Sequence, residues 1–335
     1  MAAGRPHGKG FAEYKNKDTY EGEYVKGRRQ GYGIYTFSDG EKYEGQWFQD
    51  QQHGKGTFYF KNDNRYEGLW YRDYQQGHGV MYYYNGHKYE GDWYMDMRQG
   101  KGRYTFPGGA FYDGEWREDK KWGEGTFDWG DGTTYSGQWV DNQRHGKGIN
   151  RYSNGDLYIG EWKDDIQDGR GMYKFANGDQ YDGQYVQGER TGHGIFKYAN
   201  GDRYTGLFLN GCKNGEGTFE WKNGDVYAGQ WKDDMQNGHG KLTKKSGDVF
   251  EGNFSNGNVD GEIIIHFHDG SKFKGTYRNG KRNGKAIEVN KDGVRFEGSY
   301  VDDMRDGPFV EKDRNGRITA QGTYRNGIRE LTDSQ

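Results

Sequence analysis

The chain has 335 residues, 17% of them aromatic, with 60 glycines, a single cysteine and a formal net charge of -3. With Cys212 alone, an intrachain disulfide and a cysteine zinc cluster are excluded, and the aromatic content together with the low net charge argues against disorder. A nearly neutral chain also lacks the basic surface that binding to nucleic-acid phosphates requires, so we expect no nucleic-acid partner.

From Tyr20 to Phe296, one short pattern returns every 23 residues: aromatic, any residue, Gly, any residue, aromatic. A fixed period of this size indicates a repeat array, in which each unit buries its apolar face against its neighbours. We number each repeat from its first aromatic residue, which is position 0. These thirteen aromatic residues are Tyr20, Tyr43, Tyr66, Tyr89, Tyr112, Tyr135, Tyr158, Tyr181, Tyr204, Tyr227, Phe250, Phe273 and Phe296.

Each repeat predicts two β-strands. Residues 31–37 and 43–47 alternate with a period of two, which is typical of strands with one packed face and one solvent face. Asp39-Gly40 lies between them and predicts a type I′ hairpin turn. Position 7, always Gly, Asp or Asn, predicts the second turn. The expected fold is all-β: an elongated, twisted single-layer antiparallel meander, solenoid-like, of tandem β-hairpins, advancing about 10 Å per repeat.

The two faces of this ribbon are expected to differ. Tryptophans at position 4 share one face with the leading tyrosines, and glycines at positions 2 and 13 leave room for rings to lie across the backbone. We expect the other face to be polar, with residues such as Glu23 and Gln46 at position 3. The position 4 tryptophans, which we take as a candidate partner groove, are Trp47, Trp70, Trp93, Trp116, Trp139, Trp162 and Trp231.

The pattern Tyr-x-Gly-x-Trp, then Gly-x-Gly, then Asn-Gly, is complete in residues 135–155. It resembles the MORN (membrane occupation and recognition nexus) repeat, and the resemblance covers nearly the whole chain. We expect a partial repeat in residues 1–19, thirteen repeats in residues 20–318 and a degenerate repeat with a tail in residues 319–335, all within one domain.

The resemblance implies a function only in outline. MORN repeats accompany catalytic domains or membrane anchors in some proteins, and here the repeats leave no residues for either. The repeat-only members look like scaffolds of cytoskeletal, ciliary and flagellar assemblies. With no apolar run suited to a signal peptide or a membrane span, we expect a cytoplasmic protein associated with a cilium, a flagellum or the cell cortex.

The C-terminal repeats depart from the pattern. Position 13 changes from Gly to Ile263, Ala286 and Phe309, and the segment Ile263-Ile264-Ile265 places apolar side chains on both sheet faces. These units either cap the array or mediate self-association. Because open sheet edges favour pairing with another chain, we predict a homodimer through the C-terminal repeats. The residues proposed to form it are Ile263, Ile264, Ile265 and Phe309.

The sequence offers little for catalysis. The Gly-x-Gly pairs do not open a helix after a strand, as phosphate-binding loops do, so they are interpreted as structural. His266-x-His268 lacks a third ligand at metal spacing, and Cys212 fits a surface turn. We therefore expect no enzyme, no cofactor and no metal site.

One charge asymmetry remains. Residues 273–295 carry seven cations and two carboxylates. Such a patch either keeps a capping end soluble or binds anionic lipid headgroups such as phosphoinositides. The candidate lipid-binding residues are Lys274, Arg278, Lys281, Arg282 and Lys285. Membrane tethering through these residues is the alternative to the main hypothesis, a non-catalytic scaffold that docks partner proteins on its aromatic groove.

Overall fold

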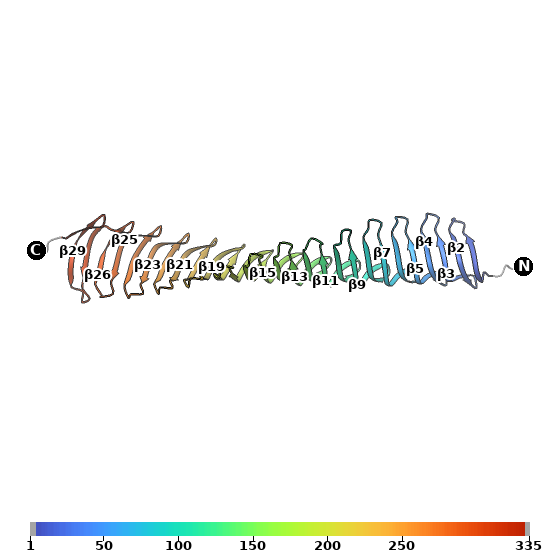
Figure 1. The fold of residues 1–335 in the computed structure, drawn as a ribbon, viewed down its shortest axis with the longest axis horizontal. Helices are drawn as coiled ribbons and strands as arrows, with labels where there is room; N and C mark the ends of the chain where they lie inside the picture. The colour runs from blue at the N-terminus through green and yellow to red at the C-terminus, as the bar shows by residue number, and fades with distance from the viewer. Residues whose placement is uncertain (1–4, 332–335) are drawn as a thin grey trace. The chain divides into compact units, whose positions relative to one another are not determined.

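A computed structural model describes residues 5–331 of the chain. Those residues form thirty strands and no helix, so the predicted all-β class is confirmed. The chain divides into two compact units, Met1–Ile166 and Gln167–Gln335, and the single domain expected from the sequence stays a prediction. Within each unit, successive strands lie side by side as hairpins of one antiparallel meander (Figure 1).

The strands of the first unit are β1 (Gly8–Glu13), β2 (Thr19–Val25), β3 (Arg28–Thr36), β4 (Lys42–Phe48), β5 (Gln51–Tyr59), β6 (Arg65–Tyr71), β7 (Tyr74–Tyr82), β8 (Lys88–Tyr94), β9 (Met97–Thr105), β10 (Phe111–Arg117), β11 (Lys120–Asp128), β12 (Thr134–Val140), β13 (Gln143–Arg151) and β14 (Leu157–Lys163).

The remaining strands are β15 (Ile166–Lys174), β16 (Gln180–Val186), β17 (Glu189–Lys197), β18 (Arg203–Leu209), β19 (Cys212–Glu220), β20 (Val226–Lys232), β21 (Met235–Thr243), β22 (Val249–Ser255), β23 (Asn258–His266), β24 (Lys272–Arg278), β25 (Lys281–Val289), β26 (Arg295–Val301), β27 (Met304–Arg305), β28 (Gly307–Lys312), β29 (Ile318–Arg325) and β30 (Ile328–Leu331).

The type I′ turn expected at Asp-Gly and Asn-Gly lies at the other connection between strands. After β3, Gly40 donates its N–H to the carbonyl of Phe37 and has a φ of 97°, whereas Asp39 does not adopt a positive φ. This is a type I turn followed by a left-handed glycine. The type I′ turns lie at positions 6 and 7, where Gln49 and Asp50 have φ values of 50° and 71°.

Strand pairs joined by a type I′ turn, such as β4 with β5, also contain a bulge that the period-two pattern did not reveal. The pairing of β4 with β5 shifts register between Gly45 and Trp47. Gly54, at position 11, takes a φ of 62° there, and the side-chain Oε1 of Gln46 accepts the backbone N–H of Lys55 at 3.0 Å. The bulge bends the strand between the glycines at positions 2 and 13 and the type I′ turn.

In the repeats that begin with tyrosine, such as the one at Tyr43, this ring lies across two glycines and forms the core. Tyr43 is fully buried, and its hydroxyl donates to the carbonyl of Gln46 at 2.9 Å. A Cβ atom on Gly45 or Gly56 would overlap this ring. The predicted use of glycine to admit rings is therefore confirmed, and the tyrosine also supplies a hydrogen bond that spacing alone did not predict.

Tryptophans connect one repeat to the next. Trp47 meets Tyr20 of the preceding repeat and Tyr43 of its own in edge-to-face contacts, with ring centroids 5.4 and 5.2 Å apart. Its Nε1 donates to the carbonyl of Gly33 at 3.1 Å. Such aromatic pairs each contribute about 0.5–1.5 kcal/mol beyond the area they bury, so neighbouring repeats stabilise one another.

The C-terminal repeats build a different core. Ile263, Ile265 and Phe309 are 1–3% exposed and pack in a cluster with residues such as Phe273 and Phe296. The prediction that these three residues form a self-association surface is therefore wrong, because side chains of the same chain cover them.

Ile264 alone of the predicted self-association set is accessible, with 41% of its surface exposed on the other face. The strand Asn258–His266 thus has apolar side chains on both faces, as its sequence indicated.

Candidate functional site

The seven tryptophans predicted to form an exposed groove are buried. Their exposed fractions lie between 3% and 6%, because each indole is held between the tyrosines of two repeats. The expectation that a partner contacts their open faces is therefore wrong. They form the floor of the face that we call the aromatic face, which also carries the position 0 tyrosines. They are Trp47, Trp70, Trp93, Trp116, Trp139, Trp162 and Trp231.

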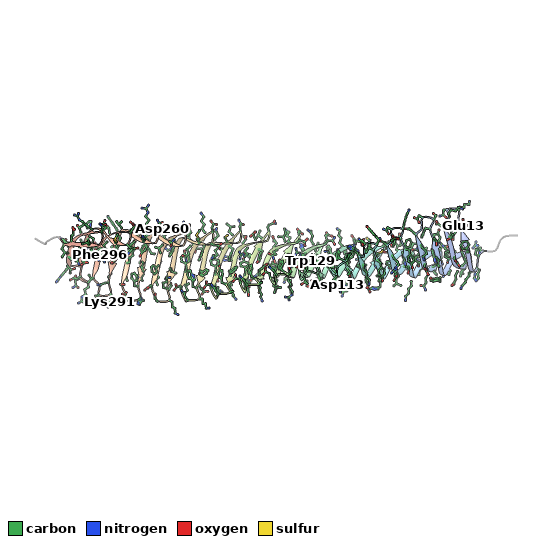
Figure 2. All side chains as sticks on the ribbon, turned by 45° about the horizontal axis from the view of Figure 1, so that its top comes forward. Glu13, Asp113, Trp129, Asp260, Lys291 and Phe296 are labelled. Carbon is green, nitrogen blue, oxygen red and sulfur yellow. The ribbon has the colours of Figure 1, made fainter. Side chains whose placement is uncertain are left out.

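A second set of rings is accessible on this face. We define the ring row as the aromatic side chains at positions 15 and 17. In the first unit, Tyr104, Phe106, Phe127 and Trp129 follow one another with centroid distances of 4.5–5.7 Å. Most of these rings are half-buried, and Trp129, labelled in Figure 2, is 39% exposed. The ring row is therefore the solvent-facing aromatic surface.

The second unit has a ring row of its own. Tyr173, Phe175, Phe196, Tyr198 and Phe219 continue in the same alternating order, at centroid distances of 4.5–5.9 Å. Sequence analysis took the tryptophans at position 4 as the candidate groove and did not single out these side chains. Their place next to the turn at positions 17–20, away from the tryptophan column, is the signal that distinguishes them.

A row of cations at position 9 was missed by sequence analysis. The guanidinium of Arg98 lies 4.4 Å from the centroid of the Trp116 ring and 5.4 Å from that of Tyr104. Its Nε donates to Oδ1 of Asp119 at 2.9 Å, and Asp119 is position 7 of the next repeat. Arg29 and Arg144 repeat the arrangement, so the pairing of position 9 with the following position 7 was the available signal.

Two lysines of this row have altered acidity. Burial against Trp139 and Phe127 lowers the pKa of Lys121 to about 8. Its position 7 neighbour is Asn142, which accepts the backbone N–H of Lys121 at 2.9 Å but supplies no charge. Burial also lowers the pKa of Lys213.

In two adjacent repeats the position 9 residue is a glutamine. Gln52 and Gln75 are 7% and 5% exposed, and each donates its backbone N–H to an aspartate of the next repeat, Asp73 or Asp96. Around Gln75 the ring row is interrupted by Met81, and a hollow of about 540 Å³ opens. The hollow is lined by Phe58, Phe60, Trp70, Gln75, Met81, Tyr83, Trp93, Asp96, Arg98 and Asp119.

The sequence predicted a polar opposite face, but the structure places exposed aromatic rings on it. Phe48, Tyr71 and Tyr94 at position 5 are 45–53% exposed, and the ring of His53 lies between the first two. Later repeats carry other side chains at this position, such as Lys163. Among residues 5–331, the strongly exposed rings on the opposite face therefore lie in the early repeats.

The predicted lipid-binding cluster is divided between the faces. Arg282 lies on the aromatic face, where it pairs with Asp303 at 3.2 Å and stacks 4.5 Å from the Tyr300 ring. The register places the other four cations on the opposite face: Lys274, Arg278, Lys281 and Lys285. The described residues provide no carboxylate within 4 Å of those four.

The described part of the chain offers no sign of a metal site. Within residues 5–331, no group of three or more His, Cys, Asp or Glu side chains is placed to hold a metal ion. His268 instead lies 2.9 Å from Asp248, which raises the pKa of this histidine. In the same residues no helix is long and apolar enough to cross a membrane.

Comparison with protein families identifies the repeat. The model of the MORN repeat matches residues 2–19, then every consecutive 23-residue segment from 20–42 to 227–249, and residues 273–295. The chain belongs to the MORN repeat family. Residues 250–272 and 296–318, where Ile263 and Phe309 replace the position 13 glycine, lie outside the matched segments. No curated protein matches this MORN repeat chain.

Solved structures show only a distant likeness. The TCP10 domain of Danio rerio CPAP, in complex with a peptide of Danio rerio STIL, is 13% identical, with 68% of this chain and 96% of that chain covered and a TM-score of 0.34. The SAS-4 (dCPAP) TCP domain of Drosophila melanogaster, in complex with a proline-rich motif of Ana2, is 16% identical, with coverages of 46% and 85% and a TM-score of 0.31. At such TM-scores the likeness has no bearing on the function of this chain.

Proposed function

We propose that this MORN repeat protein is a non-catalytic scaffold that docks segments of partner proteins on its aromatic face. Its setting would be a cytoskeletal assembly, such as a cilium or flagellum or the cell cortex, as in the repeat-only proteins it resembles. The observation that supports the proposal is the ring row, in which rings such as Tyr104, Phe106 and Phe127 follow one another across repeats and are half-buried.

The ring row has the properties of a docking surface. Its rings are fixed by their neighbours before a partner arrives, so little side-chain entropy is lost when a partner binds. Aromatic residues contribute more binding energy per residue than most others in protein interfaces. The buried tryptophans beneath support these rings, because Phe127 and Trp139 lie 6.3 Å apart. Binding would therefore use positions 15 and 17, with position 4 as structural support.

Substitution of accessible rings tests the proposal. Phe106→Ser combined with Trp129→Ser removes two rings of the ring row without touching the buried tryptophans. We expect pull-downs from the source cell to lose partners that the wild-type protein captures. The matched control, Tyr71→Ser combined with Tyr94→Ser, removes rings of similar size from the opposite face. An unchanged set of partners for the folded ring-row variant would contradict the proposal.

A second candidate function, binding to anionic lipids, is favoured by one observation. Lys274, Arg278, Lys281 and Lys285 share the opposite face, and Lys274 and Lys285 line a hollow of about 730 Å³ there. Each basic residue near a charged membrane contributes about 1 kcal/mol. The same hollow is also lined by Glu251, Glu262 and Glu297, whose negative charges would weaken this attraction.

Vesicle flotation separates the two functions. Binding to phosphoinositide vesicles at low salt, lost when Lys274, Arg278, Lys281 and Lys285 are changed to glutamate, would support tethering. Arg282→Glu serves as the control, since that residue lies on the aromatic face. If the wild-type protein does not float with anionic vesicles at low salt, the lipid function is excluded.

A further inference from the structure

We propose that Gln75 with Asp96, and Gln52 with Asp73, form two cation sites that lack an internal cation and receive arginine or lysine side chains of a docked partner. The inference rests on the proposed docking function and specifies the chemistry of the partner segment. It follows from a comparison of the chain's own repeats, in which the same place is filled by an internal cation.

The filled version of the site shows what the place can hold. In the repeat that begins at Tyr89, Arg98 lies against Tyr104 and Trp116, and its charge is balanced by Asp119 at 2.9 Å. The Arg98 side chain is 19% exposed, so this cation is largely withdrawn from water. The surrounding rings and the carboxylate together replace its hydration.

In the version that lacks an internal cation, the anion remains. Asp73 and Asp96 are exposed, and no cationic side chain in the described residues lies within 4 Å of either carboxylate. Both aspartates accept a backbone N–H through Oδ1, at 2.8 and 2.7 Å, and this bond needs no charge, as Asn142 shows. The negative charge is therefore not required by the turn.

Other repeats provide an internal contrast. Gln167 and Gln236 also occupy position 9, but the residues at the following position 7 are Gly188 and Gly257. In those repeats the cation and the carboxylate are both absent. Only the adjacent pair, Gln52 and Gln75, combines an uncharged position 9 with a retained aspartate.

The hollow provides the space that a partner's side chain needs. It lies over Gln75 and combines the Asp96 carboxylate with the half-buried rings of Phe60 and Tyr83. The rings offer their π-systems to a guanidinium or ammonium group, and Asp96 offers the opposite charge. Arg98 borders the hollow as well, but Asp119 compensates its charge.

The spacing of the two sites selects the conformation of the partner. Equivalent residues in consecutive repeats are two strands apart, which is about 9.6 Å. A polyproline II segment places every third side chain on one side, about 9.3 Å apart. In a β-strand the third residue along points to the opposite side, and in an α-helix the seventh residue along is about 10.5 Å away. A proline-rich segment with basic residues three apart therefore fits best.

Designed peptides test the proposal on the full chain. The probe is a twelve-residue peptide of four Arg-Pro-Pro units, compared by calorimetry with a peptide in which neutral citrulline replaces each arginine. A third peptide spaces its arginines four residues apart. We expect the Arg-Pro-Pro peptide to bind at least tenfold more tightly than either of the others, because only it places two cations in the two sites.

Variants locate the binding. Gln75→Arg supplies an internal cation like that of Arg98. Asp96→Asn removes the charge but keeps the backbone hydrogen bond, as Asn142 does. We expect each substitution to lower the affinity for the Arg-Pro-Pro peptide about tenfold. Gln236→Arg, in a repeat with Gly257, is the matched control and should change nothing. Thermal unfolding and circular dichroism of each variant confirm that it is folded.

The outcomes distinguish this inference from the docking function itself. The proposal of cation sites is overturned if the wild-type protein binds the arginine and citrulline peptides equally well. It is also overturned if Gln75→Arg and Asp96→Asn both bind the Arg-Pro-Pro peptide with wild-type affinity. If cellular partners are nevertheless released by the Phe106→Ser and Trp129→Ser changes, docking on the aromatic face stands without them. Loss of preference only in the control Gln236→Arg would also overturn the assignment.

Discussion

Tyr112 lies across Gly125 and donates its hydroxyl to the carbonyl of Glu115 at 2.9 Å. This contact explains a correlation at the residue scale. Where position 0 is tyrosine, position 13 is glycine; where it is Phe250, Phe273 or Phe296, position 13 carries a side chain. Phenylalanine has no hydroxyl to hold its ring over the backbone, so the place can be filled from position 13.

The first prediction follows from this correlation. Gly125→Ala should lower the free energy of unfolding of its repeat by about 1–3 kcal/mol, because the new Cβ overlaps the Tyr112 ring. Ala286→Gly, at the same position beneath Phe273, should cost only about 0.5–1 kcal/mol, the usual effect of glycine in a strand. Native-state hydrogen exchange of the two regions measures both. A Gly125→Ala protein as stable as the wild type would refute the steric account.

The second prediction concerns Lys121, whose pKa burial lowers to about 8. The unfolded chain holds this proton up to a pH of about 10.4. Above the folded pKa the unfolded state binds more protons, so stability rises with pH. We expect the local free energy of unfolding to increase between pH 7.5 and 9.5. Asn142→Asp, which supplies the missing carboxylate, and Lys121→Gln, which removes the titrating group, should both flatten this dependence; a falling profile in the wild type would contradict it.

At the scale of strands and turns, the sequence predicted which segments pair but placed the type I′ turn at the wrong connection. The Asp-Gly and Asn-Gly pairs are compatible with more than one hairpin turn, and here only the glycine takes a positive φ. The type I′ turns use residues such as Gln49 and Arg72, with φ values of 50° and 51°, which no propensity would suggest. Their geometry is imposed by the two-residue loop between paired strands.

The third prediction uses the exception at position 20. Asp63 has a φ of 64° where most repeats have glycine. A left-handed conformation costs a residue with a Cβ about 1 kcal/mol or more, so Asp63→Gly should stabilise its hairpin by about 1 kcal/mol. Chemical denaturation followed through the neighbouring tryptophans measures the change. Gly155→Asp, at position 20 of another repeat, should destabilise by a similar amount; stabilisation by both changes would contradict the explanation.

At the scale of the whole molecule, the sequence identified the aromatic face but not which of its rings are accessible. A tryptophan at position 4 is covered by tyrosines from two repeats, and this burial depends on stacking between repeats rather than on pattern within one. The position 9 cations were missed because their carboxylate partners lie 21 residues further along the chain. The period-two pattern predicted which residues share a face, but it did not predict which of those side chains are exposed.

The fourth prediction is the homodimer, which now depends on Ile264 rather than on the buried Ile263, Ile265 and Phe309. We expect light scattering to give twice the chain mass for the full chain and a monomer for a chain ending near residue 248. Ile264→Lys should yield the monomer without unfolding, whereas Ile159→Lys, equally exposed at 39%, should remain dimeric. A monomeric full chain would end the proposal.

Site-specific photocrosslinking in the source cell tests docking on the aromatic face most directly. A photoreactive phenylalanine analogue would replace Phe106 or Tyr198 in the ring row, and Tyr71 or Tyr94 on the opposite face, one at a time. The account predicts covalent adducts with partner proteins from Phe106 and Tyr198, and few or none from Tyr71 and Tyr94. Adducts formed only from Tyr71 and Tyr94 would show that partners bind the opposite face and would contradict the account.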